Sequence, residues 1–254
     1  MGKTTTVFLI QGIFFAGLIL FGVIAVIMRN RKNQAIKEQA IAQGFTWFGS
    51  GTEPGCSNLG GDAGNSFGYA IGNDLMTKYL GMVPFGLGSS RIISSLCAKR
   101  GKYGVCYCFT YQYSTGSGKN RTTHYYSLLL YEGPYYFPQL CIRPQTSMES
   151  LVQNLGFRDI QLESAEFNNR WHISCADEKF AYAFIDPQMM EFIDDLRVGN
   201  FATFGPGMFF IANGTEAMTQ HLPIMESLIE HIPGFVAKDH SIAKPQRPLG
   251  GVNI

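Results

Sequence analysis

A continuous apolar stretch from Val7 to Met28 constrains this chain more than any other feature of its sequence. It contains no charged residue, and Gln11 is its one strongly polar side chain. A helix of this length measures ~33 Å, which matches the ~30 Å hydrocarbon core of a bilayer. A cleaved signal peptide would have a shorter apolar region and a small-residue cleavage site, and a buried core helix is rarely apolar on every side. The stretch therefore predicts a transmembrane helix in a single-pass membrane protein.

The charges beside this stretch predict its orientation. Lys3 precedes it, whereas Arg29, Arg31, Lys32 and Lys37 follow it. Because the more positive flank normally stays in the cytoplasm, we expect the N-terminus outside the cell membrane and the remaining chain in the cytoplasm. In that compartment the cysteines would stay as thiols.

Composition divides the chain into four expected parts. Residues 1–30 are a short tail and the transmembrane helix, 31–83 a juxtamembrane helix and Gly-rich linker, 84–236 a globular domain, and 237–254 a disordered tail. The linker is inferred from Gly, Ser and Asn over 49–68, and a helix ending at Gly44 precedes it. The tail is inferred from its Pro and Gly content and low hydrophobicity.

Alternation of side chains between Tyr103 and Tyr113 is the strongest strand signal. Every second residue there is aromatic or β-branched, and the period of two is typical of a strand with one face on a core. Runs at 92–97, 123–131 and 139–143 predict antiparallel neighbours joined by short turns. Later segments alternate strands with helices, among them 148–155 and one that starts at Asp186-Pro187. The expected fold class is α+β: an N-terminal transmembrane helix, then a mostly antiparallel sheet with helices packed on one face.

The charges of the chain are unevenly distributed. The chain has 20 Lys and Arg against 19 Asp and Glu, but five bases lie at the anchor, so residues 38–254 carry 15 − 19 = −4. An acidic domain lacks the footprint of a nucleic-acid binder, so no nucleic-acid partner is expected. Residues 78–121 contain seven bases and no acid, whereas 132–230 contain 14 acids and five bases. This asymmetry indicates one face turned towards an anionic surface.

We therefore predict a membrane-facing basic surface, since each Lys or Arg near an anionic leaflet contributes ~1 kcal/mol. Its residues are Arg29, Arg31, Lys32, Lys99, Arg100, Lys102, Lys119 and Arg121. The expected partners are the lipid bilayer, through residues 7–28, and another protein, through the acidic second half.

No local motif predicts a catalytic residue, a metal ligand set or a cofactor. The sequence from Thr115 to Lys119 is similar to the end of a phosphate-binding loop, but Tyr113 and Asn120 replace two residues that this loop requires. Cys106 and Cys108 lie on one strand face without a second pair of ligands. We interpret them as small buried hydrophobes, with metal binding as the alternative.

Three classes of function stay open. The favoured one is a membrane-anchored, non-enzymatic, cytoplasm-facing interaction or accessory module. The first alternative is a membrane-bound enzyme resembling a thiol hydrolase, which would pair Cys106 or Cys108 with His124 across a hairpin. The second is a structural subunit of a larger membrane complex, in which the apolar helix itself makes the contacts.

Several short motifs between residues 84 and 236 carry a resemblance to a known group. They include Pro84-Phe85-Gly86, Phe109-x-Tyr111-x-Tyr113, Glu163-Ser164 with Phe167-Asn168, and Ile232-Pro233 with Phe235-Val236. In their order and spacing, the chain resembles a group of actinobacterial single-pass membrane proteins with an N-terminal helix and a domain of unknown function. The resemblance implies the same architecture and supplies no activity.

Overall fold

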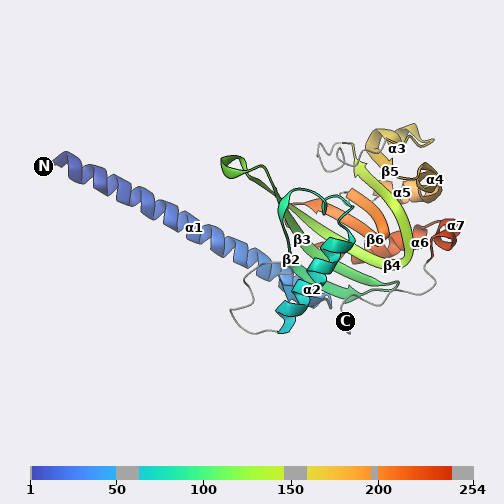
Figure 1. Cartoon of the computed structure of the whole chain (residues 1–254), viewed down its shortest axis with the longest axis horizontal. Coiled ribbons are helices and arrows are strands. Elements are labelled where there is room, and N and C mark those ends of the chain that lie inside the picture. Colours follow the sequence, from blue (N-terminus) through green and yellow to red (C-terminus); the bar gives the residue numbers. More distant parts are fainter. Residues whose placement is uncertain (1, 50–62, 146–158, 196–199, 242–254) are drawn as a thin grey trace.

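An antiparallel sheet organises the chain in the computed structural model (Figure 1). The structure describes residues 2–49, 63–145, 159–195 and 200–241, with the backbone alone at 2–15, 26, 29 and 63–67. Within these ranges the strands are β1 (Thr46–Gly49), β2 (Ser89–Arg100), β3 (Val105–Thr115), β4 (Thr122–Pro144), β5 (Trp171–Cys175) and β6 (Asn200–Asn213). Their order is β1-β2-β3-β4-β5, and β6 also pairs with β4.

The long strand β4 holds the sheet together because it pairs with three others. Its first half lies between β3 and β6, and its last residues lie between β5 and β6. The pairing with β6 shifts register between Glu132 and Phe137. Pro134 lies in that interval and has no backbone N–H to donate, so an irregularity is expected there. The strand curves visibly across the domain in Figure 1.

The two faces of β3 belong to two separate cores, whereas the alternation of its side chains predicts only one face on a core. Tyr107 and Tyr111 pack in one core with Leu75 of helix α2 (Ala63–Lys78). Cys106 and Cys108 pack in the other core with residues of the C-terminal helices. The α+β class with an antiparallel sheet is confirmed, but helices cover both faces of the sheet and not one. The reason is that the second face of β3 is also apolar at Cys106 and Cys108, which behave as small hydrophobes.

Short helices form the layer over the second core. They are α3 (Ala165–Arg170), α4 (Glu178–Phe184), α5 (Pro187–Asp195), α6 (Leu222–His231) and α7 (Gly234–Asp239), with a 3-10 turn η4 (Met218–His221) before α6. The carboxylate of Asp177 accepts hydrogen bonds from the amides of Lys179 and Phe180 and so caps α4. Asp186 Oδ1 accepts from the amide of Met189 at 2.8 Å, which confirms the expected start of α5.

Helix α1 (Gly2–Ala42) is a single helix of 41 residues that projects from the domain (Figure 1). The expected juxtamembrane helix is its continuation, and it ends beside Gly44, whose φ of +78° suits a C-terminal glycine. Among the side chains that the structure describes, no helix contains an apolar stretch long enough to cross a membrane. The expected span from Val7 to Met28 begins in the part of α1 where only the backbone is described.

Two expected boundaries differ from the structure. Residues 63–83 lie in α2 and its following turn and contribute Ile71, Leu75 and Met82 to the core, so they are part of the domain. The expected disordered tail begins too early, because α7 continues to Asp239 and Ser241 bridges to Tyr135. The helix predicted over 148–155, most of the predicted linker and the chain beyond residue 241 lie outside the described residues.

Candidate functional site beside helix α1

The last three turns of α1 are fastened to the sheet. Ile36 lies against Cys97 and Cys108 around a void of only about 10 Å³, and Ala40 is fully buried. The Nζ of Lys99 donates a hydrogen bond of 2.8 Å to the carbonyl of Gln43 and lies 5.7 Å from the ring centre of Phe45. Because a carbonyl at the end of a helix has no partner within the helix, this ammonium group caps α1 from the neighbouring strand.

Towards its N-terminus α1 separates from the sheet and leaves an open groove of about 720 Å³. Met28, Lys32 and Asn33 form the wall on α1, and Trp47 and Tyr125 line the groove from β1 and β4. Met28, Lys32 and Ile36 are spaced four residues apart and therefore lie along one stripe of the helix. This stripe faces the sheet along its length: Met28 and Lys32 lie across the groove from it, and Ile36 lies directly against it.

The floor of the groove is polar. It is made by Ser94 and Ser95 of β2 and by Thr110 and Gln112 of β3. Among the described residues these four side chains make no hydrogen bond. Among the described residues that line the groove there is no Asp or Glu, and Lys32 is the one charged residue. The groove therefore presents a positive charge and several uncommitted hydroxyl and amide groups between aromatic side chains.

Two irregularities in neighbouring strands shape this floor. β2 shifts register against β3 between Ser94 and Cys97, and Ser95 adopts a φ of +53°, a conformation that non-glycine residues rarely take. β1 shifts register against β2 between Trp47 and Gly49, and Gly49 has a φ of +78°. Bulges of this kind redirect side chains and are common beside functional sites.

Four of the predicted basic residues lie on the side of the domain from which α1 projects. Arg31 and Lys32 are exposed on α1, and Lys119 and Arg121 are exposed at the hairpin tip between β3 and β4. Figure 1 shows this tip, in green, extending from the domain in the general direction of the free end of α1. Met28 and Lys32 line the groove with Gln112, close to the same tip. The side chain of Arg29, one turn before Asn33, is outside the described residues.

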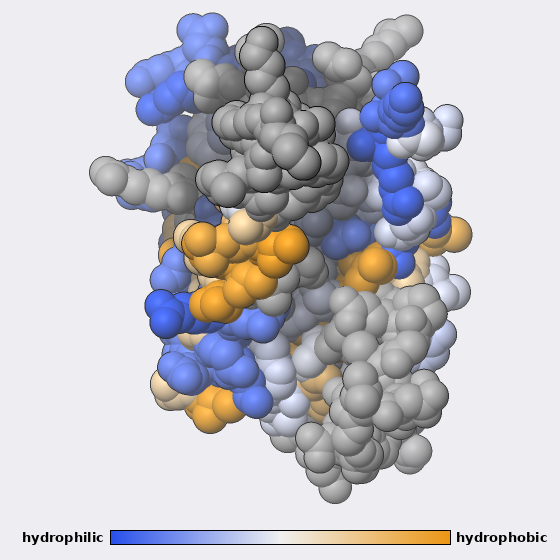
Figure 2. Space-filling model, turned by 90° about the vertical axis from the view of Figure 1, so that its left-hand side faces the viewer, coloured by the Kyte–Doolittle hydropathy of each residue, from blue (hydrophilic) through white to orange (hydrophobic). Residues whose placement is uncertain are grey.

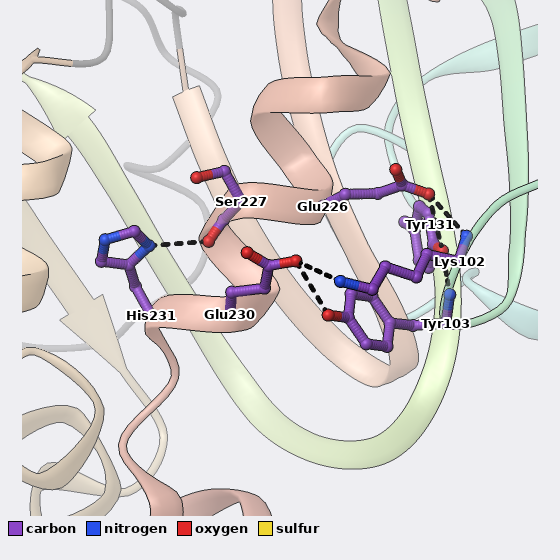
Figure 3. A network of polar contacts seen from close by, with 7 residues as sticks. All are labelled: Lys102, Tyr103, Tyr131, Glu226, Ser227, Glu230 and His231. Atoms are coloured by element: carbon purple, nitrogen blue, oxygen red, sulfur yellow. Dashed lines mark hydrogen bonds and ion pairs between the residues drawn. The ribbon is translucent and has the colours of Figure 1, made fainter.

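The other predicted basic residues lie at the opposite end of β3, whose 11 residues span ~36 Å. Lys99 caps α1, and Arg100 is exposed where β2 ends. Lys102 Nζ lies 2.7 Å from Glu230 Oε1, which also accepts a hydrogen bond from Tyr103 (Figure 3). The eight residues therefore do not form one continuous surface.

The contacts of Lys102 belong to a network that joins the β2–β3 turn to α6 (Figure 3). The hydroxyl of buried Tyr131 accepts from the amide of Tyr103 at 2.8 Å and reaches Glu226 at 3.4 Å. The hydrogen bond to Glu230 raises the pKa of Lys102, and the same contact lowers the pKa of Glu230. The sequence carries no local signal for this network, because its partners are about 125 residues apart.

The thiol–imidazole pair that the enzyme alternative requires is not formed. Cys108 is opposite Leu129 on β4, five residues from His124, which places the sulfur ~16 Å from the imidazole along the strand. His124 instead stacks on Tyr113 and contacts the hydroxyl of Thr115 at 2.9 Å. Burial raises the pKa of Cys108 well above its ordinary value, so the thiol stays protonated. The thiol-hydrolase alternative with these residues is therefore wrong.

The cysteines pack as hydrophobes within the part of the chain that the structure describes. Cys97, Cys106, Cys108, Cys141 and Cys175 are all buried and free. Cys106 and Cys108 have their sulfurs 3.9 Å apart, but no cluster of three or more potential ligands is present among the described residues.

Comparison with models of known protein families and with curated proteins finds no match. Among solved structures, the fold is similar to that of the mycobacterial trehalose monomycolate transport factor A, TtfA, with a TM-score of 0.52. The alignment covers 80% of this chain and 96% of that chain at 10% sequence identity. At this identity the likeness establishes a shared α+β fold and transfers no residue or activity.

Proposed function

We propose that this chain is a membrane-tethered, non-enzymatic accessory module. Residues 7–28 span the cytoplasmic membrane with the N-terminus outside, and the sheet domain lies in the cytoplasm. The hairpin tip and the base of α1 contact the anionic inner leaflet, and the acidic end of the domain is left for a protein partner.

The observation that carries this proposal is the exposed apolar surface of α1. Ile19 exposes 68% and Phe21 73% of its surface, and the same holds along the helix as far as Met28. In Figure 2, which looks at the side from which α1 projects, hydrophobic residues gather near the middle of the face with hydrophilic residues around them. Monomeric soluble proteins rarely expose contiguous apolar surface of this kind. Together with the uncharged stretch from Val7, this apolar surface is best buried among the acyl chains of a bilayer.

The coupling of α1 to the sheet supports a role in orienting the domain. The helix runs unbroken from the apolar stretch into the contacts made by Ile36, Ala40 and Lys99, so no flexible linker intervenes. Lys119 and Arg121 then extend on the membrane side together with Arg31 and Lys32. Four such charges near an anionic leaflet contribute ~1 kcal/mol each, which is enough to bias the domain towards one orientation.

Several acidic residues of the second half are carried by helices at the far end of the molecule (Figure 1). Glu166, Glu178 and Glu191 are exposed on α3, α4 and α5, which Figure 1 shows opposite the free end of α1. A surface of this charge is repelled by an anionic leaflet and suits a protein partner with a basic patch. TtfA, which shares the fold, is named a transport factor, and an accessory role is compatible with this arrangement. The resemblance to actinobacterial membrane proteins remains a prediction.

The anchoring is tested with the full chain expressed in a bacterium. We expect it in the membrane pellet after an alkaline carbonate wash, and a fluorescent protein fused to the C-terminus should be bright. As a matched control, Leu18, Phe21 and Ile24 are changed to Gln, which should release the chain into the soluble fraction. Release of the unmodified chain by carbonate, or activity of a periplasmic phosphatase fused at the same C-terminus, would overturn the proposal.

A further inference from the structure

We propose that the groove between α1 and the sheet binds the headgroup of an inner-leaflet phospholipid that carries both an anionic phosphate and free hydroxyl groups. The inference rests on the proposed membrane anchoring and adds a ligand to it. The ligand would be drawn from the leaflet beside α1, with its acyl chains left in the bilayer.

The position of the groove favours a lipid over a soluble ligand. Met28 is the last residue of the apolar stretch and also lines the groove. Lys32 follows one turn later, ~6 Å further along the helix axis. The groove therefore lies where α1 leaves the hydrocarbon core, at the depth of phosphates and headgroups. Trp47 and Tyr125 line the groove, and aromatic side chains of this kind are enriched at the membrane–water interface.

The shape of the groove favours a headgroup over an acyl chain. Its volume of about 720 Å³ falls within the usual range of ligand pockets, ~300–1,000 Å³. Ser95 and Thr110 also line a separate void of only about 10 Å³, where Ile36 of α1 lies beside Cys97. A tunnel for a long apolar chain is thus closed at the end away from Met28.

The chemistry of the lining favours phosphate together with hydroxyl groups. Lys32 supplies one ammonium group, and no carboxylate opposes it among the described residues that line the groove, so an anion is attracted there. Thr110 lines the groove and is 5% exposed, and its hydroxyl has no hydrogen-bond partner among the described residues. Gln112 and Ser94 add an amide and a hydroxyl beside it. Such groups pair with a polyol headgroup, whereas a choline headgroup offers no donor or acceptor to them.

The backbone at the floor is an independent sign of a built site. Ser95 holds a φ of +53° within the bulge of β2, although no glycine is used there. A residue in this region persists only when its surroundings enforce the conformation, and such positions cluster at ligand sites. The bulge brings two consecutive serines, Ser94 and Ser95, into the lining of one groove, whereas regular alternation along a strand directs successive side chains to opposite faces.

The test uses the full chain in mild detergent and measures retained lipid by native mass spectrometry. The probes are phosphatidylglycerol, phosphatidylmethanol, which has the same charge but no free hydroxyl, and phosphatidylcholine, which is zwitterionic. We expect phosphatidylglycerol to be retained roughly three- to tenfold better than phosphatidylmethanol, and phosphatidylcholine least. Equal retention of all three would overturn the proposal, while the carbonate and topology results would still decide the anchoring on their own.

Two substitutions assign the preference to the groove. Thr110→Val keeps the side-chain shape and should remove most of the difference between phosphatidylglycerol and phosphatidylmethanol. Lys32→Met should lower retention of both anionic lipids, whereas Lys119→Met, outside the groove, should leave the hydroxyl preference unchanged. An unchanged preference in Thr110→Val would overturn the assignment. Displacement of the lipid by an equal concentration of glycerol phosphate would show instead that the site takes a soluble ligand.

Discussion

The Nζ of Lys99 on β2 lies 2.8 Å from the carbonyl oxygen of Gln43, directly after the last turn of α1. This contact joins a projecting helix to the sheet through residues 56 positions apart. It occurs where the helix ends and its carbonyls lack partners, so one side chain both caps α1 and sets its direction from the domain.

Replacement of Lys99 should loosen this attachment. Lys99→Met keeps the aliphatic packing but leaves the Gln43 carbonyl without the ammonium donor, and we expect the free energy of unfolding to fall by ~1 kcal/mol. Thermal unfolding of the full chain in detergent measures the change, and hydrogen exchange at residues 40–46 should accelerate. Lys179→Met on the exposed surface of α4 is the matched control and should change neither quantity.

Tyr79 should be important for holding α2 on the sheet. Its buried hydroxyl donates to Glu132 Oε1 at 2.6 Å, and Lys78 pairs with the same oxygen at 2.7 Å. Burial, followed by the charge of Glu132, raises the pKa of Tyr79, so the phenol remains a donor. Tyr79→Phe leaves a buried carboxylate with one partner fewer and should cost ~2 kcal/mol of stability. Tyr69→Phe, at an exposed site on α2, is the control, and equal melting temperatures for the two variants would contradict this role.

The two groups of basic residues should behave differently at a membrane. The full chain is placed in nanodiscs, and a fluorophore is attached to the hairpin tip through Ser117→Cys, with Cys56 changed to Ser so that it is not labelled. Lipid that carries a quencher then reports on contact between the tip and the membrane. We expect quenching in anionic discs that weakens with salt, because exposed charges are screened over ~10 Å at 0.1 M ionic strength. The double change Lys119→Gln and Arg121→Gln should abolish it. The matched change Arg100→Gln and Lys102→Gln should leave the quenching unchanged. An equal loss of quenching in both double variants would show that the two groups form one membrane-facing surface, as the sequence predicts.

Stability should fall as the pH drops below the ordinary histidine pKa. Burial lowers the pKa of His172, which contacts Asp159 at 3.1 Å, and burial also lowers the pKa of His221. The two histidines bind protons near pH 6.5 in the unfolded chain but only at lower pH in the folded chain. Protonation therefore favours the unfolded chain, and the free energy of unfolding falls as the pH drops from about 6.5 towards the folded pKa values. Each histidine contributes at most ~1.4 kcal/mol per pH unit in that window. Unfolding in denaturant at pH 7 and pH 5 measures the slope.

The double variant His172→Gln and His221→Gln should have a shallower slope between these pH values. A slope identical to that of the unmodified chain would show that other groups cause the loss. Carboxylates such as Glu230, whose pKa is lowered by Lys102, act in a more acidic window and are separated from the histidines in this way.

Local patterns determined much of this protein without any tertiary information. The alternation from Tyr103 to Tyr113 specified β3 and its two faces, because a strand directs successive side chains to opposite sides. Asp177, Asp186 and Gly44 marked helix ends correctly, because capping depends on neighbours within one turn. The apolar stretch and its flanking charges predict an anchor and its orientation, and both stay predictions.

Only the tertiary structure decided which distant residues meet. The sequence grouped Lys102 with Lys119 because both lie in one basic segment, yet a strand separates them and Lys102 pairs with Glu230, 128 residues away. It placed the start of the domain at Pro84 and left Leu75 outside it, because the burial of Leu75 depends on a sheet face formed by later strands. The groove beside α1 has no local signal at all. Its wall, floor and rim come from α1, β1, β2, β3 and β4, and their side chains converge only through strand register, two bulges and the packing of one helix.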